Sequence, residues 1–247
     1  MAPIGGRFGV GIETTPGYGC EWREESGICW ALGSASVSGI NCVVFDIGNV
    51  LVRWDPYNLY RRMGYLDCET AAILKEIGLL EINHRVLDAG GPFSATLERL
   101  VARFPRRAEF IRAFDVRWAE SLGGIVPGSV AILDRLKQAG VPVHALSNYN
   151  REKFDIASEL FPFLKAFDQL VLSGDVGLVK PDAEIFELLI SRCGLDVSRT
   201  VFIDDTIANV ATAARLGFAT IHFNEETTDL GAELLRLGLN ADAFLQP

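Results

Sequence analysis

The sequence predicts an α/β fold, a doubly wound parallel sheet with a helical segment inserted after the first strand. Two observations support this class. Short apolar, β-branched runs alternate with amphipathic stretches, as strands and helices do around a parallel sheet. One long stretch interrupts this alternation and carries only helical periodicity. The predicted strands are residues 41–46, 141–146, 167–172, 200–203 and 218–223.

The first predicted strand ends at a carboxylate. Val43-Val44-Phe45 leads to Asp46, and the chain turns through Gly48 before a second apolar run. A continuous apolar run bounded by a turn is typical of a strand buried on both faces. In open α/β sheets the chemistry lies just beyond the carboxyl ends of the strands, where Asp46 is placed. Taken alone, this stretch is explained equally well if Asp46 is a turn residue or a helix N-cap.

Residues 57–124 are predicted to form a helical cap, inserted into a sheet-forming core of residues 39–56 and 125–247. Bulky apolar residues recur in the cap at helical spacing and are expected to pack between helices. They are Leu97, Leu100, Val101, Phe104, Phe110, Phe114 and Trp118. Because the insertion follows the carboxyl end of a strand, we expect it to cover the site.

Five further helices are predicted around the later strands. Asp182 is expected to cap the helix that runs to about residue 193, and Gly140 and Gly217 to end two others. The predicted helices are residues 128–139, 150–160, 183–193, 207–216 and 232–237.

The composition limits the classes of partner. The 247 residues are 49% hydrophobic, enough for a large packed core, and carry a formal net charge of −9. This charge disfavours nucleic acid and an anionic membrane surface as partners, but not a small anionic ligand. No apolar run reaches the roughly 20 residues that span a bilayer, and no signal peptide is recognisable. We expect a monomer or homodimer.

Two further features bear on location and order. The five cysteines are an odd, scattered set, which favours a reducing compartment and a cytoplasmic location. They are Cys20, Cys29, Cys42, Cys68 and Cys193. Residues 1–38 are glycine-rich without sustained periodicity, so we expect a loosely ordered, flexible extension to which no chemistry is assigned.

Polar residues follow three of the predicted strands. They are Asp46, Ser147 and the pair Asp204-Asp205, and Lys180 opens a helix nearby. Three converging carboxylates repel one another unless a cation neutralises them, and an all-oxygen set of this kind suits Mg²⁺. Lys180 and Ser147 can hold an anion beside the metal. A carboxylate nucleophile, a divalent metal, a lysine and a hydroxyl are the parts needed for phosphoryl transfer.

Four motifs in this order resemble those of the haloacid dehalogenase (HAD) superfamily, over about residues 41–224. They are Asp46-Ile47-Gly48-Asn49-Val50, Leu146-Ser147-Asn148, Lys180-Pro181-Asp182, and Ile203-Asp204-Asp205 followed by Asn209. One such motif is a weak signal, but four together, each at a predicted strand end or in the loop after it, are specific. The chain looks like the phosphatase branch with a helical cap after the first motif, similar to sugar-phosphate phosphatases.

The resemblance implies a Rossmann-like core and a phosphoric monoester hydrolase with Mg²⁺ as cofactor. By this analogy Asp46 is the nucleophile and forms an aspartyl-phosphate. Asp46, the Gly48 carbonyl and Asp205 would hold the metal, with Asp204 acting through water or orienting the ligands.

The same analogy assigns the phosphate-binding groups. Ser147 and the backbone of Asn148 would bind phosphoryl oxygens, and Lys180 would neutralise charge on the nucleophile and the phosphate. Asn209 is expected to tie the loop of Asp205 to its helix.

One position departs from the family pattern. Phosphatases of the family usually carry a second Asp two residues after the nucleophile, which protonates the leaving oxygen and later activates water; here that residue is Gly48. Loss of general acid–base help costs roughly 10²–10⁴ in rate. Asp55 or His84 could substitute, the leaving group could need little protonation, or the enzyme could be slow. The sugar-phosphate-phosphatase-like branch shows the same Asp-x-Gly-Asn-Val pattern.

Several alternatives remain open. A 2-haloacid dehalogenase would use the same aspartate without metal, but the adjacent pair Asp204-Asp205 favours the phosphatase. A catalytically weak, phosphate-binding member is compatible with Gly48. A receiver domain would place its acidic pair first in the chain, and a phosphomutase would need the missing Asp.

The expected substrate is a small phosphorylated metabolite, with sugar phosphates as one class. The cap should set specificity by closing over the phosphate site. Its candidate contacts are Asn83, His84 and Arg85.

Overall fold

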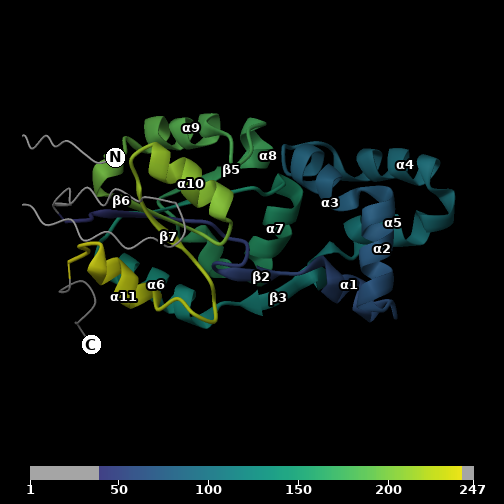
Figure 1. Cartoon of the computed structure of the whole chain (residues 1–247), viewed down its shortest axis with the longest axis horizontal. Helices are drawn as coiled ribbons and strands as arrows, with labels where there is room; N and C mark the ends of the chain where they lie inside the picture. The colour runs from purple at the N-terminus through teal and green to yellow at the C-terminus, as the bar shows by residue number, and fades with distance from the viewer. Residues whose placement is uncertain (1–38, 241–247) are drawn as a thin grey trace, which may run out of the picture. The chain divides into compact units, whose positions relative to one another are not determined.

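A five-stranded parallel sheet in the order β5-β4-β1-β6-β7 forms the centre of the protein (Figure 1). The structure is a computed structural model and describes residues 39–240, so the predicted extension of residues 1–38 lies outside the described residues. All five predicted strands are present. They are β1 (Cys42–Phe45), β4 (Val143–Ser147), β5 (Gln169–Leu172), β6 (Thr200–Asp204) and β7 (Ala219–His222).

Helices cover both faces of this sheet because successive strand side chains point to opposite faces. Val43 and Phe45 pack with residues of α6 (Pro127–Gln138) and α11 (Leu230–Arg236). Val44 packs on the other side, with α9 (Ala183–Cys193) and α10 (Ile207–Arg215). Figure 1 shows α9 and α10 above the sheet and α6 and α11 below it. The predicted doubly wound α/β class is therefore confirmed.

Residues 56–121 form a helical insert between β1 and β4. Its elements are α1 (Pro56–Arg62), α2 (Asp67–Ile77), α3 (Leu79–Ile82), the π-helix η1 (Asn83–Leu87), α4 (Phe93–Arg103), η2 (Pro105–Arg107), α5 (Ala108–Val116) and η3 (Trp118–Ser121). Most of the predicted apolar stripe is buried there; Phe110, for example, stacks on Tyr60 with ring centroids 3.7 Å apart. That the insert is a separate cap domain remains a prediction.

Two short strands that the sequence analysis missed connect the insert to the core. β2 (Val52–Trp54) pairs antiparallel with β3 (Leu122–Ile125). Arg53 reinforces the pair, because its guanidinium donates to the Ile125 carbonyl and forms an ion pair with Glu225. Both ends of the insert are therefore tied together where they leave the core.

The remaining helical elements lie in the connections between β4, β5 and β6. They are α7 (Arg151–Leu160), η4 (Pro162–Lys165), the four-residue α8 (Ser173–Val176) and η5 (Val197–Arg199). Asp182 occupies the N-cap position of α9, as predicted, although its side chain makes no capping hydrogen bond. Lys180 lies in the loop before α9 rather than at the start of the helix. Within residues 39–240, no helix has the length and apolar character needed to cross a membrane.

Candidate active site

The carboxyl ends of β1, β4 and β6 bring the predicted site residues together. Asp46 directly follows β1, and its N–H donates to the Ile203 carbonyl at 2.8 Å, so Asp46 lies level with the end of β6. Ser147 and Asp204 are the last residues of the two strands that flank β1. From β5 the chain crosses over β4 and β1 to β6, and ligands of open α/β sheets bind where strand order reverses in this way.

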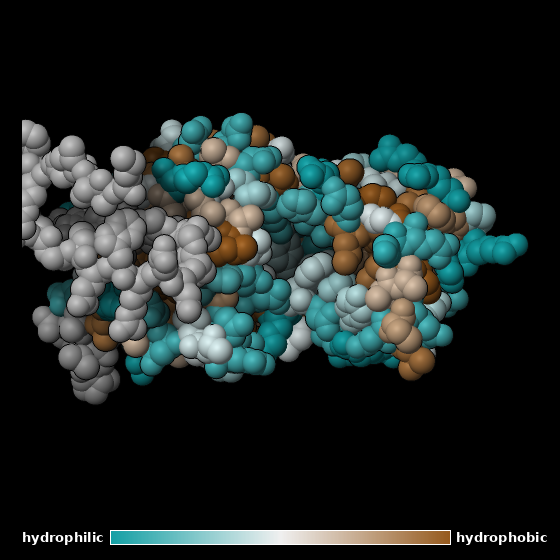
Figure 2. Space-filling view, in the orientation of Figure 1, coloured by the Kyte–Doolittle hydropathy of each residue, from teal (hydrophilic) through white to brown (hydrophobic). Residues whose placement is uncertain are grey.

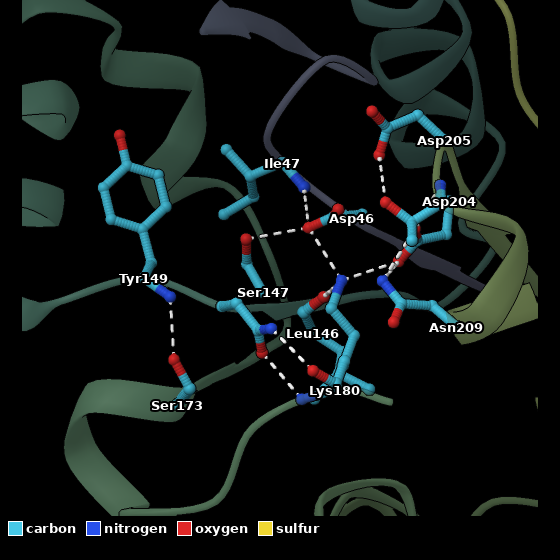
Figure 3. A network of polar contacts seen from close by, with 12 residues as sticks. Asp46, Ile47, Leu146, Ser147, Tyr149, Ser173, Lys180, Asp204, Asp205 and Asn209 are labelled. Carbon is cyan, nitrogen blue, oxygen red and sulfur yellow. Dashed lines mark hydrogen bonds and ion pairs between the residues drawn. The ribbon is translucent and has the colours of Figure 1, made fainter. Parts of the chain in front are cut away.

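Three donors converge on one oxygen of Asp46, as Figure 3 shows. The Ile47 N–H, the Ser147 hydroxyl and the Lys180 ammonium approach Asp46 Oδ1 at 2.7, 2.8 and 2.9 Å. The other oxygen, Oδ2, receives no hydrogen bond from residues 39–240. The carboxylate is thus held firmly through one oxygen, while the second is available to a metal ion or to phosphorus.

Lys180 lies between two carboxylates and is only 1% exposed. Its ammonium is 2.6 Å from Asp204 Oδ2 and donates to the Leu146 carbonyl at 2.9 Å. The Asn148 side chain holds the Lys180 backbone from both sides, accepting from its N–H at 2.8 Å and donating to its carbonyl at 2.9 Å. The Asn148 side chain therefore acts by positioning the lysine.

Asp204 is completely buried and well supplied with donors. The Asn209 amide donates to both of its oxygens, at 2.9 and 3.0 Å, and the Thr206 N–H donates to Oδ1 at 2.8 Å. Asn209 belongs to α10 and its partner is the Asp204 side chain, directly before Asp205, so the predicted tie between this loop and the helix is made through Asp204. Asp204 is thereby fixed in one orientation.

Asp205 completes a set of three carboxylates. Asp46, Asp204 and Asp205 each offer one oxygen, and these oxygens lie within 4.8 Å of one another. The donors described above already occupy both oxygens of Asp204. The oxygens with fewer hydrogen bonds, and therefore more available to a metal, are those of Asp205 and Oδ2 of Asp46. Carboxylate oxygens are the donors that Mg²⁺ prefers, so these residues fit the predicted metal.

The electrostatics of the site favour a bound cation. Burial raises the pKa of Asp46 to about 7, an effect that Lys180 opposes and the two neighbouring aspartates reinforce. Burial and the charge of Asp204 also raise the pKa of Asp205. Burial alone would lower the pKa of Lys180, but Asp46 and Asp204 raise it above its ordinary value. One lysine charge is thus shared among three carboxylates, and a divalent cation would relieve their repulsion.

A cavity of about 160 Å³ extends from Asp46 to the insert. Four aromatic side chains line its walls, namely Trp54, Phe93, Trp118 and Tyr149. On the face shown in Figure 2, the surface is hollowed between the core and the helices of the insert.

Several polar residues that line the cavity are already engaged by neighbours. Lys153 forms an ion pair with Asp115 and lies 4.3 Å from the centre of the Phe93 ring. The Asn150 amide donates to the Leu87 carbonyl at 2.8 Å. The side chains that remain available to a ligand on this side of the cavity are therefore mainly aromatic.

Sequence reasoning missed Asp88, which follows the π-helix η1 and lines the cavity. Burial and, less strongly, the charge of Asp46 raise the pKa of its carboxyl well above the ordinary value. An acidic residue two positions before Gly90, in a loop of the insert, was the signal available in the sequence.

Of the other predicted residues, one lines the cavity and three lie elsewhere. Asn83 lines the cavity, but His84 and Arg85 are not among its lining residues, so contact of either with a substrate is not supported. The Arg85 side chain is 71% exposed and forms an ion pair with Glu81. Asp55 is the N-cap of α1, accepts the Tyr57 N–H at 2.9 Å and also forms an ion pair, so it serves the insert's own structure.

Comparison with known proteins agrees with this site. The family model for haloacid dehalogenase-like hydrolases matches residues 40–217, so the chain belongs to this family of hydrolases. The match begins two residues before β1 and ends after α10, and therefore includes all four motifs.

Relatives within the family have more than one activity. The sesquiterpene phosphatase astK of Aspergillus oryzae is 25% identical over 74% of this chain and 89% of its own length. The (S)-2-haloacid dehalogenase 4A of Burkholderia cepacia is 27% identical over 40% of this chain and 43% of its own. The drimenol cyclase drtB of Aspergillus calidoustus is 30% identical over 76% of this chain but only 34% of its own. The chain therefore spans less than half the length of the last two proteins.

Solved structures share the fold. A predicted HAD-like hydrolase from Porphyromonas gingivalis is 26% identical, with a TM-score of 0.60 over 82% of this chain and 100% of its own. A HAD family enzyme from Bacteroides thetaiotaomicron, solved in complex with magnesium and inorganic phosphate, is 23% identical, with a TM-score of 0.62 over 78% of this chain and 99% of its own.

Proposed function

We propose that the protein is a Mg²⁺-dependent phosphatase of small phosphomonoesters that works through an aspartyl-phosphate on Asp46. The observation that carries the proposal is the cluster of Asp46, Asp204 and Asp205, whose oxygens lie within 4.8 Å of one another beside a buried lysine. A carboxylate nucleophile next to a metal site and a fixed cation is the arrangement that phosphoryl transfer requires.

Each residue has a distinct role in this proposal. Asp46 attacks phosphorus through one carboxylate oxygen and would hold the metal through the other, while Ser147 and Lys180 orient the carboxylate through Oδ1. The phosphorus–oxygen bond to the leaving group breaks as the bond to Asp46 forms. Water then attacks phosphorus, releases inorganic phosphate and restores the carboxylate.

The metal would be held by Asp46, Asp205 and the Gly48 carbonyl, with Asp204 orienting the set through Lys180 and Asn209. When bound, Mg²⁺ supplies positive charge that offsets the charge developing on the transferred phosphoryl group. Lys180 supplies the fixed part of that charge.

A dehalogenase function is less well supported by the site. Displacement of halide from carbon by Asp46 needs no metal, and for that reaction Asp205 beside Asp204 would only add repulsion. The dehalogenase relative also aligns with less than half of this chain.

The aromatic walls of the cavity favour a phosphomonoester with an apolar group over a sugar phosphate. Its walls include four aromatic side chains, while Asn148, Asn150 and Lys153 are already bonded within the protein. Among the described residues, the Tyr149 hydroxyl and the indole N–H groups of Trp54 and Trp118 remain as donors on these walls. An ester with several hydroxyls would bury more of them unpaired than an apolar ester would, which is costly. The sesquiterpene phosphatase relative, whose substrate class is apolar, agrees with this choice.

The proposal is tested by phosphate release from a panel of phosphomonoesters, with Mg²⁺ or with EDTA. The panel contains butyl and isopentenyl phosphate, glucose 1-phosphate and glycerol phosphate, and halide release from 2-chloropropionate is measured in parallel. We expect Mg²⁺-dependent hydrolysis with the highest kcat/KM for the apolar esters, abolished in Asp46→Asn.

Other outcomes would redirect the assignment. Metal-independent halide release without phosphatase activity would make the protein a dehalogenase. Tight Mg²⁺-dependent binding of phosphate without turnover would make it a phosphate-binding member of the family. A higher kcat/KM for glucose 1-phosphate would refute the apolar substrate class and keep the phosphatase.

A further inference from the structure

The proposed phosphatase reaction needs a proton donor that the first motif does not supply. Gly48 stands where the family resemblance implies an acid–base Asp, and a Cβ atom added at Gly48 would meet nothing within 4 Å. The space beside the nucleophile is therefore open to a leaving group or to a side chain from elsewhere. Among the described residues that line the cavity, the acidic ones are Asp46 and Asp88.

The other ionisable groups that line the cavity are poorly suited to the task. Lys180 is paired with two aspartates, and Lys153 is paired with Asp115. Burial raises the pKa of the Tyr149 hydroxyl far above its ordinary value, which disfavours transfer of its proton to the leaving oxygen. This leaves Asp88.

The carboxyl of Asp88 is held by one oxygen. The Asn83 amide donates to Oδ2 at 3.0 Å, and no residue in the described range 39–240 donates to Oδ1. Asp88 closes the π-helix η1, in which its N–H donates back to the Asn83 carbonyl at 2.8 Å. One turn of the insert thus sets both the backbone and the side chain of Asp88, and π-turns occur frequently at functional sites.

Through Ser173, the backbone of Asp88 is linked to the core loop that follows Ser147. The Ser173 hydroxyl donates to the Asp88 carbonyl and accepts the Tyr149 N–H at 2.8 Å. Figure 3 shows the second of these bonds, with Tyr149 two residues beyond Ser147. Asp88 therefore has a fixed location relative to the nucleophile's own hydrogen-bond partners.

Close packing on both sides of Asp88 reinforces this attachment. The Asn150 amide donates to the carbonyls of Leu87 and Gly91, at 2.8 and 3.3 Å. A Cβ atom at Gly90 would lie 2.5 Å from the Gly174 carbonyl oxygen. Residues 87–91 thus lie directly against the core.

We propose that Asp88 is the general acid and base of the reaction, supplied by the insert in place of the residue missing at position 48. This assignment rests on the proposed phosphatase function. In the first step the Asp88 carboxylic acid gives its proton to the leaving oxygen as the phosphorus–oxygen bond breaks, which yields an alcohol and the Asp88 carboxylate. In the second step that carboxylate takes a proton from the water that attacks the aspartyl-phosphate, so phosphate leaves and Asp88 is protonated again.

The test compares two leaving groups in Asp88→Asn, which keeps the shape of the side chain and can still accept from Asn83. An alkyl phosphate needs its leaving oxygen protonated, whereas 4-nitrophenyl phosphate leaves as a stable phenolate. We expect kcat/KM, which reports the formation of the aspartyl-phosphate, to fall by about 10²–10⁴ for butyl phosphate and by less than about tenfold for the aryl ester. The kcat values of both esters should fall, because both share the hydrolysis step that uses Asp88 as base. Ser173→Ala removes the hydrogen bond that anchors Asp88, so it should lower kcat/KM for the alkyl ester more than for the aryl ester, by a smaller factor than Asp88→Asn does.

A second variant tests the assignment by restoring the acid. Gly48→Asp introduced into Asp88→Asn should recover most of the lost alkyl phosphatase rate, because position 48 has open space for the side chain. Equal losses of kcat/KM for both esters in Asp88→Asn, or no loss, would overturn the role of Asp88 and leave the phosphatase function standing. A wild-type protein that hydrolyses neither ester with Mg²⁺ would refute the proposed function, and this role with it.

Discussion

Lys180 is the residue whose removal should destabilise the site most. It is 1% exposed and lies 2.9 Å from Asp46 and 2.6 Å from Asp204. Lys180→Met keeps most of the volume of the side chain but leaves two buried carboxylates without their cation. Removing one partner of a buried ion pair costs about 3–5 kcal/mol, and we expect the upper half of that range because two carboxylates lose their partner.

A matched control is available at Lys137. Its ammonium is also 2.6 Å from a carboxylate, that of Asp168, but the two side chains are 33% and 43% exposed. Exposed ion pairs contribute about 0–1 kcal/mol, so the free energy of unfolding of Lys137→Met should be close to that of the wild type. Because both variants make the same chemical change at the same distance, their difference isolates the effect of burial.

The assay is chemical denaturation at pH 8 with EDTA, repeated with Mg²⁺ and at pH 5.5. Mg²⁺ should recover part of the loss in Lys180→Met because it neutralises the same carboxylates. The loss should also shrink at pH 5.5, where carboxylates whose pKa burial has raised become protonated. If Lys180→Met and Lys137→Met unfold with the same free energy in EDTA at pH 8, the buried charge cluster contributes no more to stability than an exposed ion pair does.

Three further predictions concern the metal, a supporting hydrogen bond and the attachment of the insert. The folded pKa of Asp46, about 7, exceeds its unfolded value, so its ionisation costs stability as pH rises from about 4 through 7. Mg²⁺ should therefore raise Tm more at pH 8 than at pH 5.5, and equal shifts would argue against a shared carboxylate site. Asn209→Leu removes two hydrogen bonds to the buried Asp204. It should lower the free energy of unfolding by about 1–3 kcal/mol and weaken Mg²⁺ binding measured by calorimetry, and wild-type stability would contradict this. Gly90→Ala and Gly64→Ala impose the same backbone strain at a φ of +91°, but only the Cβ atom at position 90 meets a backbone oxygen, at 2.5 Å. Gly90→Ala should therefore lose phosphatase activity while Gly64→Ala keeps it. Equal activities would show that this close packing is dispensable.

Most of the site was predictable because its residues follow strands. The apolar runs before Asp46, Ser147 and Asp204 identify three strands, and parallel strands end at one edge of a sheet. Adjacency of these side chains therefore follows from the fold class, as the bonds of Ser147 and Lys180 to Asp46 illustrate. Lys180 follows no strand and lies in a loop before α9, so strand ends predict its position less directly, and the family motif supports it.

The side of the site formed by the insert was not predictable, and the π-helix gives the physical reason. Its hydrogen bonds run from residue i+5 to residue i, as from the Asp88 N–H to the Asn83 carbonyl and from the Gly91 N–H to the Val86 carbonyl. This wider turn rotates the residues after it relative to an α-helix, so helical periodicity misplaces them. Asp88 lines the cavity, while the predicted His84 does not.

The pairing of β2 with β3 was missed for a different reason. Val52 and its partner Ile125 lie at opposite ends of the insert, and each strand is only three or four residues long. Strands this short carry no clear alternation, and Gly123-Gly124 in β3 indicates a boundary rather than a strand. The two strands come together only when the insert between them has folded.

The most direct test of the account is chemical trapping of the phosphorylated enzyme. Wild-type protein is mixed with butyl phosphate and Mg²⁺, quenched in acid and reduced with borohydride, which converts an aspartyl-phosphate to homoserine that mass spectrometry locates. The account predicts homoserine at position 46, dependent on both substrate and Mg²⁺. Turnover with no modification at Asp46, or with the modification at another carboxylate, would contradict it.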